Sequence, residues 1–337
     1  MSEAGLEYTE QVLEDMIEKV RNLIPGYGFS SDTEVVLLNI SENATFQIGS
    51  GDGRAILRVH RQGYHTFDEI SSELSWMDDI RRSGIVEVPS TVPDERGTTI
   101  QTLLAGRGIP ARHAVMFSYL PGKSPSPEEN LAHWFEVLGE VTARLHRHSM
   151  NWIPPKGFVR HTWDADAMHG QRNLWGAWQN GIGLHNDGKA TVGLAVDKVH
   201  RALLDYGQGA DRFGLVHADL RLANLLVDGD RLKVIDFDDS GFTWYMYDFA
   251  AAVSFIEHLP SIPELRDAWI EGYSKAGHIT SQDRAAISTL VLARRILLMA
   301  WLASHREIPL AKEIGVTFTE QTVALSELYL RDRFMSD

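Results

Sequence analysis

Two acidic residues and one amide residue stand out in the stretches "HADLRLAN" (217–224) and "VIDFDD" (234–239). The first stretch contains Asp219 and Asn224, and the second contains Asp236. The runs between them, "LLV" and "LKVID", are joined by "DGD" and predict a β-hairpin that would fold the two stretches together. Carboxylate and amide oxygens are ligands that Mg²⁺ accepts, so this spacing indicates a site for a cation bound to phosphate.

Such a set of side chains is suited to phosphoryl transfer. The reaction requires little covalent chemistry from the protein. It requires a metal ion that bridges phosphates, an oriented hydroxyl group, and compensation of the charge on the transferred group. A kinase is therefore the first hypothesis.

The stretch "HADLRLAN" resembles the His-x-Asp-(four residues)-Asn motif of aminoglycoside phosphotransferases and their choline-kinase, type II homoserine-kinase and fructosamine-kinase relatives. "IDFDD" is similar to their metal-binding segment, and "SENATFQI", "AILRVHR", "VMFSYLPG", "LGEVTARLH" and "MYDFAAAV" follow the family's usual order. The similarity is closest to the bacterial branch that contains stress-response kinase A and type II homoserine-kinase-like proteins. The resemblance implies a protein-kinase-like α+β fold of two lobes and an ATP-dependent phosphotransferase.

The resemblance also implies a role for each residue of the loop. Asp236 and Asn224 would hold Mg²⁺, and Asp219 would accept or orient the substrate hydroxyl. Arg221 is a second catalytic candidate, because many Ser/Thr protein kinases carry at this place a Lys that reaches the transferred phosphate. His217 is expected to hold the loop through hydrogen bonds.

The nucleotide is expected to bind in the first part of the chain. Where many relatives carry a Lys on the third strand, "ILRV" offers Arg58, with Glu73 in the next helix as its partner. "NISENATFQI" contains no glycine, so backbone N–H groups around Ser41 and Asn43 are expected to cap the phosphates. Backbone groups near the lobe junction would meet the adenine edge. These are the groups of Met116, Phe117, Ser118 and Tyr119.

The order of predicted elements favours a small sheet lobe followed by a larger helical lobe. A helix over 8–23 with Thr9 as its cap, short β-rich runs, and a helix over 66–84 predict an antiparallel sheet with flanking helices. The stretch "PGKSPSP" then ends periodic structure, and most later segments up to residue 305 read as helices. We therefore expect a nucleotide-binding lobe over 1–120 and a helical lobe with the catalytic loop over 121–337.

Composition limits the partners. The net charge of -14 and the pI near 5.4 argue against broad nucleic-acid binding. The absence of Cys excludes disulfides and thiol catalysis. The most membrane-like segment, 289–304, carries Arg294 and Arg295 in its middle, which predicts a buried helix and no membrane partner. The N-terminal residues show no signal-peptide pattern, which favours a cytoplasmic location, and the oligomeric state is open.

The expected acceptor is a small hydroxylated molecule that carries an amine. Between residues 211 and 250 there are eight Asp against four Lys or Arg, and negative potential in a cleft concentrates cations. Trp244, Tyr245 and Tyr247 would offer aromatic faces to an ammonium group unless they lie in the core. Asp238 and Asp239 are candidates for the substrate or a second Mg²⁺, whereas Asp248 is expected to fix the catalytic loop.

Two alternatives remain open. One is a protein Ser/Thr kinase of the stress-response kinase A type, which would use the same Asp219. The other is a non-catalytic nucleotide-binding regulator, which Arg58 favours and which the retention of Asp219, Asn224 and Asp236 opposes.

Overall fold

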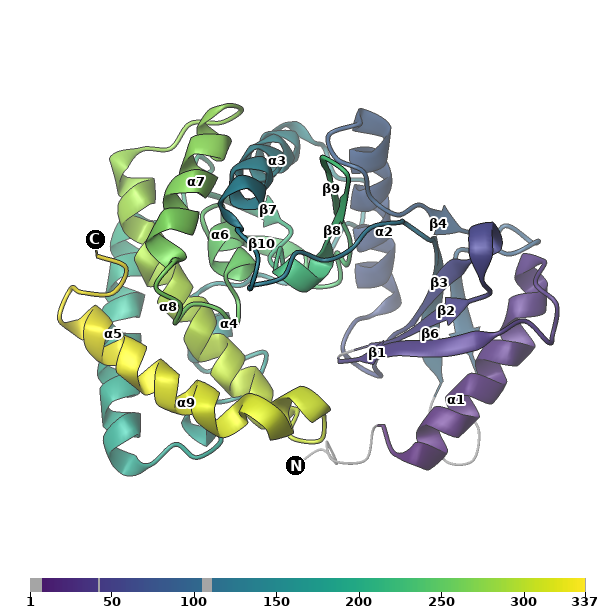
Figure 1. Cartoon of the computed structure of the whole chain (residues 1–337), viewed down its shortest axis with the longest axis horizontal. Coiled ribbons are helices and arrows are strands. Elements are labelled where there is room, and N and C mark those ends of the chain that lie inside the picture. Colours follow the sequence, from purple (N-terminus) through teal and green to yellow (C-terminus); the bar gives the residue numbers. More distant parts are fainter. Residues whose placement is uncertain (1–7, 42, 105–110, 337) are drawn as a thin grey trace. The chain divides into compact units, whose positions relative to one another are not determined.

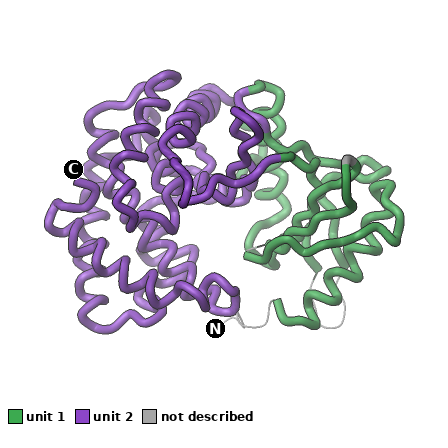
Figure 2. The backbone as a smooth tube through the Cα atoms, in the orientation of Figure 1, with its two compact units in different colours: residues 1–84, 88–121, 154–159 green, residues 85–87, 122–153, 160–337 purple. Residues whose placement is uncertain are grey.

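The computed structural model describes residues 8–41, 43–104 and 111–336 (Figure 1). The chain divides into two compact units (Figure 2). The N-terminal unit comprises residues 1–84, 88–121 and 154–159, and the C-terminal unit comprises residues 85–87, 122–153 and 160–337. Two short segments therefore depart from a single boundary near residue 121: 85–87 belongs to the C-terminal unit and 154–159 to the N-terminal unit.

An antiparallel sheet forms the centre of the N-terminal unit, with six strands among the described residues. Its strand order is β1-β2-β3-β6-β4, and β5 also pairs with β6. The strands are β1 (Val35–Ile40), β2 (Ala44–Ile48), β3 (Ala55–Val59), β4 (Thr91–Val92), β5 (Ile100–Leu103) and β6 (Arg112–Ser118). The sequence does not predict β4, because two residues are too few to show an alternating pattern.

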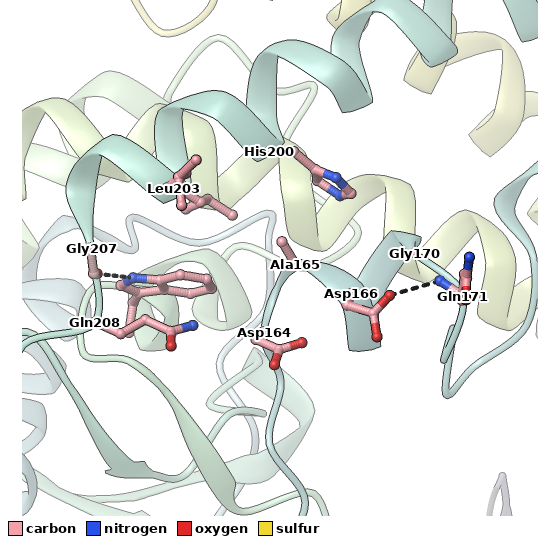
Figure 3. Close-up of a pocket in the computed structure, with 11 residues that line it drawn as sticks. Asp164, Ala165, Asp166, Gly170, Gln171, His200, Leu203, Gly207 and Gln208 are labelled. Carbon is pink, nitrogen blue, oxygen red and sulfur yellow. Dashed lines mark hydrogen bonds between the residues drawn. The ribbon is translucent and has the colours of Figure 1, made fainter.

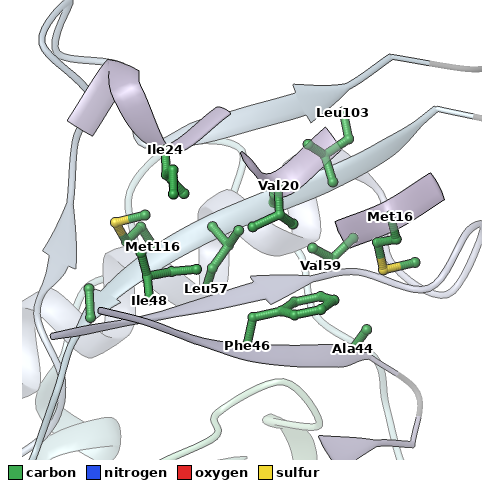
Figure 4. Close-up of a cluster of buried hydrophobic side chains, with 12 residues drawn as sticks. Met16, Val20, Ile24, Ala44, Phe46, Ile48, Leu57, Val59, Leu103 and Met116 are labelled. Atoms are coloured by element: carbon green, nitrogen blue, oxygen red, sulfur yellow. The ribbon is translucent and has the colours of Figure 1, made fainter. Parts of the chain in front are cut away.

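Helix α1 (Glu10–Leu23) packs against one face of this sheet. Met16 and Val20 of the helix belong to the same buried cluster as Leu57 and Val59 of β3 (Figure 4). Successive side chains of a strand point to opposite faces, so Arg58, between Leu57 and Val59, projects from the other face. The sheet thus separates the apolar core from the cation predicted to bind phosphate.

Local capping interactions set the helix boundaries in this unit. Thr9 caps α1, and its side chain accepts a hydrogen bond from a backbone N–H of the first turn. Helix α2 (Phe67–Ser83) begins with a capping box between Thr66 and Glu69. It ends at Gly84, whose φ of 67° is the left-handed conformation that glycine adopts at least cost. This helix carries Glu73.

The C-terminal unit is mainly helical. Its helices are α3 (Ala132–Asn151), α4 (Ala165–His169), α5 (Asn186–Tyr206), α6 (Tyr247–Ala252), α7 (Ile262–Ser274), α8 (Ser281–Ser304) and α9 (Pro309–Leu330). Helix α9 lies beyond the predicted helical series and packs against α5 and α8. Its buried face mixes apolar residues with small and polar ones, among them Gly315, Thr319, Thr322 and Ser326, so the apolar periodicity that predicts a helix is interrupted.

Two short antiparallel pairs of strands support the predicted site. Strand β8 (Leu225–Asp228) pairs with β9 (Arg231–Val234) through a turn at Gly229, whose φ is 64°. This is the predicted hairpin. Strand β7 (Phe213–Val216) pairs with β10 (Gly241–Trp244), a strand that the sequence reading does not anticipate.

Helix α8 is long and apolar enough to cross a membrane by length and composition, but 89% of its apolar window is buried within the protein. Arg294 is 2% exposed and Arg295 is 0% exposed. Each guanidinium group pairs with a buried carboxylate at 2.6 Å, Arg294 with Asp219 and Arg295 with Glu257. The prediction of a buried helix is confirmed.

Candidate active site

The carboxylate of Asp219 is the centre of the candidate site in the C-terminal unit. It lies in the loop between β7 and a short 3-10 turn, Leu222–Asn224. Asn224 Nδ2 donates to Asp219 Oδ2 at 2.6 Å and to the Asp219 main-chain oxygen at 2.9 Å, which closes the loop on itself. Arg221 Nε donates to Oδ2 at 3.2 Å, and Arg294 Nη2 donates to Oδ1 at 2.6 Å. The two predicted catalytic residues and one predicted metal residue are therefore in mutual contact.

These donors keep Asp219 ionised. Burial alone would raise the pKa of the Asp219 carboxyl, but the guanidinium groups of Arg221 and Arg294 hold that pKa below its usual value. An ionised carboxylate can accept a hydrogen bond from a substrate hydroxyl and orient it.

Asp248 fixes the backbone directly before Asp219. Its Oδ1 accepts the backbone N–H of Ala218 at 2.7 Å, and its Oδ2 lies 2.9 Å from His146 Nε2. Ala218 has a φ of 65°, a left-handed conformation that is costly for a residue with a side chain. The predicted role of Asp248 as an acceptor of backbone N–H groups is confirmed.

His217 joins the catalytic loop to the strand that leads to Asp236. Its Nδ1 accepts the backbone N–H of Asp219 at 3.2 Å, so its Nε2 is assigned as the donor to the Ile235 carbonyl, also at 3.2 Å. The ring packs against Phe237 with centroids 4.4 Å apart. The contacts agree with the predicted structural role of His217.

Asn224 lies next to the residue before Asp236 at the base of the β8–β9 hairpin. The backbone N–H of Ile235 donates to the Asn224 carbonyl at 3.0 Å, which places Asp236 one residue from the pairing. Asp236 has a φ of 62° and is partly exposed. Because the Asn224 amide nitrogen binds Asp219, its amide oxygen is the atom left to face a cation, so the donor set of one carboxylate and one amide oxygen fits Mg²⁺.

The loop after Asp236 is held by its backbone. Arg160 donates to the carbonyl of Ser240 at 2.6 Å and also to that of Asp238, and Trp163 Nε1 donates to the carbonyl of Asp239 at 3.0 Å. Backbone bonds between residues 161–163 and Phe242 extend this attachment along β10. We call residues 160–163 the anchoring segment. No role was assigned to Arg160 from the sequence.

The acidic and aromatic residues proposed to attract an ammonium group separate into two kinds. Trp244 is 1% exposed, Tyr245 4% and Tyr247 0%, so the alternative that they belong to the core is the correct one. The carboxylate of Asp248 is engaged in the contacts described above. Of the two acidic candidates that follow Asp236, Asp239 is partly exposed whereas Asp238 is 5% exposed, so Asp239 is the more accessible carboxylate.

In the N-terminal unit, Arg58 and Glu73 form the predicted ion pair. Arg58 Nη2 lies 2.8 Å and 2.7 Å from the two carboxylate oxygens of Glu73. Arg58 is 5% exposed and Glu73 0%, so this is a buried pair and not a surface salt bridge. Glu73 thus fixes the direction of the guanidinium group, whose contact with phosphate stays a prediction.

Polar groups of Ser41 and Asn43, in the turn between β1 and β2, already have hydrogen-bond partners within the protein. The backbone N–H of Ser41 donates to the Asn43 carbonyl at 3.0 Å, which closes the turn. The Asn43 side chain accepts the backbone N–H of Arg61 at 3.2 Å. Ser41 N–H is therefore engaged within the turn, and the phosphate-capping role of these two residues stays a prediction.

Of the residues assigned to the adenine edge, Met116, Phe117 and Ser118 end β6, and Tyr119 follows the strand. Met116 has its side chain in the buried cluster beneath the sheet (Figure 4). Ser118 exchanges two hydrogen bonds with Ser90, through its N–H at 2.8 Å and its hydroxyl at 3.0 Å. Phe117 lies 5.1 Å from the Arg58 guanidinium, and the Tyr119 ring stacks on Arg54 at 3.9 Å. Their contact with a nucleotide stays a prediction.

A pocket of about 620 Å³ lies beside α4 and α5 in the C-terminal unit (Figure 3). Asp164, Leu203 and Trp244 contribute to its lining. Trp244 Nε1 donates to the Gly207 carbonyl at 2.7 Å at one end of it. Of the residues that the structure describes, the lining includes none of the predicted catalytic or metal residues. We therefore do not assign the phosphate acceptor to this pocket.

Arg294 is the residue of the site that the sequence reading missed. The sequence signal was present, because an Arg in a long apolar helix requires a buried partner. Spacing alone could not identify this partner, since Asp219 is 75 residues away. The three-dimensional structure brings the two together.

Comparison with known proteins identifies the family of this chain. The sequence pattern of the family described as "Phosphotransferase enzyme family" matches residues 36–288. The solved structure of a microcompartment-associated aminopropanol kinase is 40% identical, with a TM-score of 0.87, and the match covers 95% of this chain and 99% of that one. The resemblance stated from the motifs is confirmed.

Two further relatives are more distant. An amicoumacin kinase of Bacillus subtilis (strain 168) is 24% identical over 238 residues, which is 70% of this chain and 67% of that protein. The structure of an amicoumacin kinase in complex with AMP-PNP, Ca²⁺ and Ami is 19% identical with a TM-score of 0.74, and the match covers 94% of each chain. The second likeness shows the fold alone, and the prediction of a protein-kinase-like α+β fold is confirmed.

Proposed function

Because the chain belongs to the phosphotransferase enzyme family, we propose that it is an ATP- and Mg²⁺-dependent kinase that phosphorylates a hydroxyl group of a small, amine-bearing molecule. The observation that carries this proposal is the contact of Asn224 with Asp219, together with the backbone pairing of Asn224 with Ile235, the residue before Asp236. A cytoplasmic location accompanies the proposal.

In the proposed reaction, each residue has a separate task. Asp219 accepts a hydrogen bond from the substrate hydroxyl. This bond directs the oxygen of the hydroxyl at the γ-phosphorus. Asn224 and Asp236 hold Mg²⁺, which when bound neutralises charge on the phosphate oxygens. Arg221 lies close enough to Asp219 to contact the transferred phosphate group, and Arg58, oriented by Glu73, binds the remaining phosphates.

The amine on the acceptor is supported by two observations. The structure that is 40% identical over nearly the whole chain is that of an aminopropanol kinase. Asp239 is partly exposed and lies in the loop that directly follows the proposed metal residue. We propose that Asp239 attracts the ammonium group while Asp219 receives the hydroxyl, which favours short amino alcohols.

The test is a kinase assay with purified protein, Mg-ATP and matched acceptors. The panel contains amino alcohols, amino sugars and hydroxy amino acids beside neutral polyols of the same size, and a generic protein substrate. ADP release and product mass are recorded for each. We expect the highest kcat/KM with a short amino alcohol.

The same panel separates the alternatives. Transfer mainly to the protein substrate would identify a protein Ser/Thr kinase. Nucleotide binding without a phosphorylated product from any acceptor would indicate a non-catalytic regulator. A preference for the neutral polyols would retain the kinase and contradict the amine.

A further inference from the structure

The guanidinium group of Arg294 binds Asp219 and is itself held by several other side chains. Its Nη2 donates to Asp219 Oδ1 at 2.6 Å, Nη1 donates to the Tyr247 hydroxyl at 3.1 Å, and Nε lies 3.3 Å from Ser254 Oγ. The guanidinium carbon also lies 4.9 Å from the centroid of the Trp175 ring. Each nitrogen of the guanidinium group therefore has a partner, and the plane of the group is fixed.

The two oxygens of Asp219 differ in their contacts. Within the described part of the chain, Oδ2 accepts hydrogen bonds from Asn224 and Arg221, whereas Oδ1 accepts one, from Arg294. Each oxygen of an ionised carboxylate offers about two lone-pair sites. Oδ1 is accordingly the oxygen with capacity for one more donor.

We propose that Arg294 is a positioning residue for phosphoryl transfer, which fixes the carboxylate of Asp219 so that Oδ1 receives the acceptor hydroxyl. This inference rests on the proposed function and adds a residue and an atom to it. The hydroxyl oxygen bonds to the γ-phosphorus while the bond between that phosphorus and the β-phosphate oxygen of ADP breaks, and the hydroxyl proton passes to Asp219 Oδ1. ADP leaves with the electron pair of the broken bond, and Asp219 then releases the proton to solvent.

The geometry requires Arg294 to act through Asp219. Arg294 is 2% exposed and lies in the middle of α8. It holds Oδ1 of the Asp219 carboxylate, whereas Asn224 holds Oδ2. Rotation of the carboxylate would break the bond to Arg294 or to Asn224. Loss of Arg294 would remove one restraint and leave Asp219 free to turn away from the acceptor, which lowers kcat rather than nucleotide affinity.

The adjacent Arg295 provides a matched control. It is buried in the same helix and donates to Glu257 at 2.6 Å, to Thr322 Oγ1 at 3.0 Å and to the Phe318 carbonyl at 3.1 Å. These partners belong to α9 and to the segment before α7, and none of them is a hydrogen-bond partner of Asp219 among the described residues. Arg295→Met therefore removes the same kind of buried charge without a change at the carboxylate.

The experiment is a double-mutant cycle on the full-length protein, with kcat and KM for ATP measured in single-turnover and steady-state assays. We expect Arg294→Met to lower kcat about 10- to 100-fold with little change in KM for ATP. In an Asp219→Asn background the same substitution should lower kcat by less than about 3-fold, because its route of action is already lost. Arg295→Met should lower kcat little and equally in both backgrounds.

The outcomes are distinct. Equal effects of Arg294→Met in the two backgrounds, or wild-type kcat in the folded variant, would overturn the inference while the kinase activity stands. A wild-type protein that phosphorylates no acceptor would overturn the proposed function and this inference with it. If Arg294→Met does not fold, Arg294→Gln and Arg294→Lys carry the test: the neutral Gln variant must be the slower, and equal rates overturn the inference.

Discussion

Asp248 Oδ1 accepts the backbone N–H of Ala218 at 2.7 Å, and this bond fixes a left-handed residue directly before Asp219. Asp248 is 0% exposed, so its removal leaves a buried N–H group without a partner. We expect Asp248→Ala to lower the free energy of unfolding by about 1–3 kcal/mol and to lower kcat as well, because the loop before Asp219 relaxes. Urea unfolding and steady-state assays measure the two effects.

Tyr273 provides the control for Asp248. Its hydroxyl lies 3.0 Å from Nδ1 of His146, at the far end of the same hydrogen-bond chain. Tyr273→Phe should affect stability more than kcat. If Asp248→Ala retains the wild-type kcat, Asp248 does not fix the loop for catalysis.

Replacement of Asp219 tests the acceptor of the substrate hydroxyl. Asp219→Asn keeps the size of the side chain but loses the charge that accepts the hydroxyl proton. We expect kcat to fall about 10²- to 10⁴-fold, with Mg-ATP affinity measured by calorimetry nearly unchanged. A folded variant with wild-type activity would rule out this role.

The metal assignment predicts a different response at Asp236. Asp236→Ala removes a charged oxygen ligand and should raise the Mg²⁺ concentration needed for half-maximal activity about 10-fold or more. Asp230→Ala, at the exposed turn of the same hairpin, changes the net charge equally and should leave the Mg²⁺ titration unchanged. Coincident titration curves for the two variants would contradict the assignment.

Arg58 should control nucleotide affinity. Arg58→Lys keeps a positive charge opposite Glu73 but loses the planar fork, so we expect the KM for ATP to rise about 10-fold with a smaller change in kcat. Arg112→Lys, a buried cation on β6 that donates to the His60 carbonyl at 3.4 Å, is the control within the same sheet. An unchanged KM for ATP in the Arg58 variant would mean that another cation binds the phosphates.

The lowered pKa of the buried His169 side chain predicts that the protein loses stability on mild acidification. Burial lowers the pKa of His169 to about 3 from a usual value of about 6.5, and its Nε2 lies 2.8 Å from the Ala293 carbonyl. The pKa of His169 is lower in the folded state than in the unfolded state. The contribution of neutral His169 to the free energy of unfolding is therefore complete above pH 6.5 and is lost as the pH falls from 6.5 toward 3. At pH 5 the loss amounts to about 2 kcal/mol.

Two variants check the contribution of His169. His169→Gln should flatten the dependence of the unfolding free energy on pH between about 6.5 and 5. His133→Gln, at an exposed position of α3, should leave that dependence as in the wild type. Equal slopes for the wild type and His169→Gln would show that His169 does not stay neutral in the folded protein.

The parts of the site that the sequence predicts are those made by local spacing. Asp219 and Asn224 share one loop, and a two-stranded hairpin leads from that loop to Asp236, so their proximity follows from turn geometry. The Arg58–Glu73 pair joins a strand to the next helix, which is also a short connection. Helix caps at Thr9, Thr66 and Gly84 are local as well.

The remaining parts depend on contacts between segments that are distant in sequence. Arg160 lies 78 and 80 residues from the carbonyl groups that it binds, and no pattern within its own segment identifies them. The type of a side chain also leaves its environment open, since Trp244 and Tyr247 suit a substrate pocket and a core equally. Helix α9 escaped prediction because small and polar residues make up much of its buried face.

The anchoring segment has a consequence for the evolution of acceptor preference. Arg160 and Trp163 bind carbonyl oxygens of residues 238–240, and every residue type presents that oxygen. The bond from Trp163 to residue 239 therefore does not depend on the side chain at that partly exposed position. Position 239 can serve as a site for saturation mutagenesis, in which new acceptors are selected while the backbone bonds of the loop are kept.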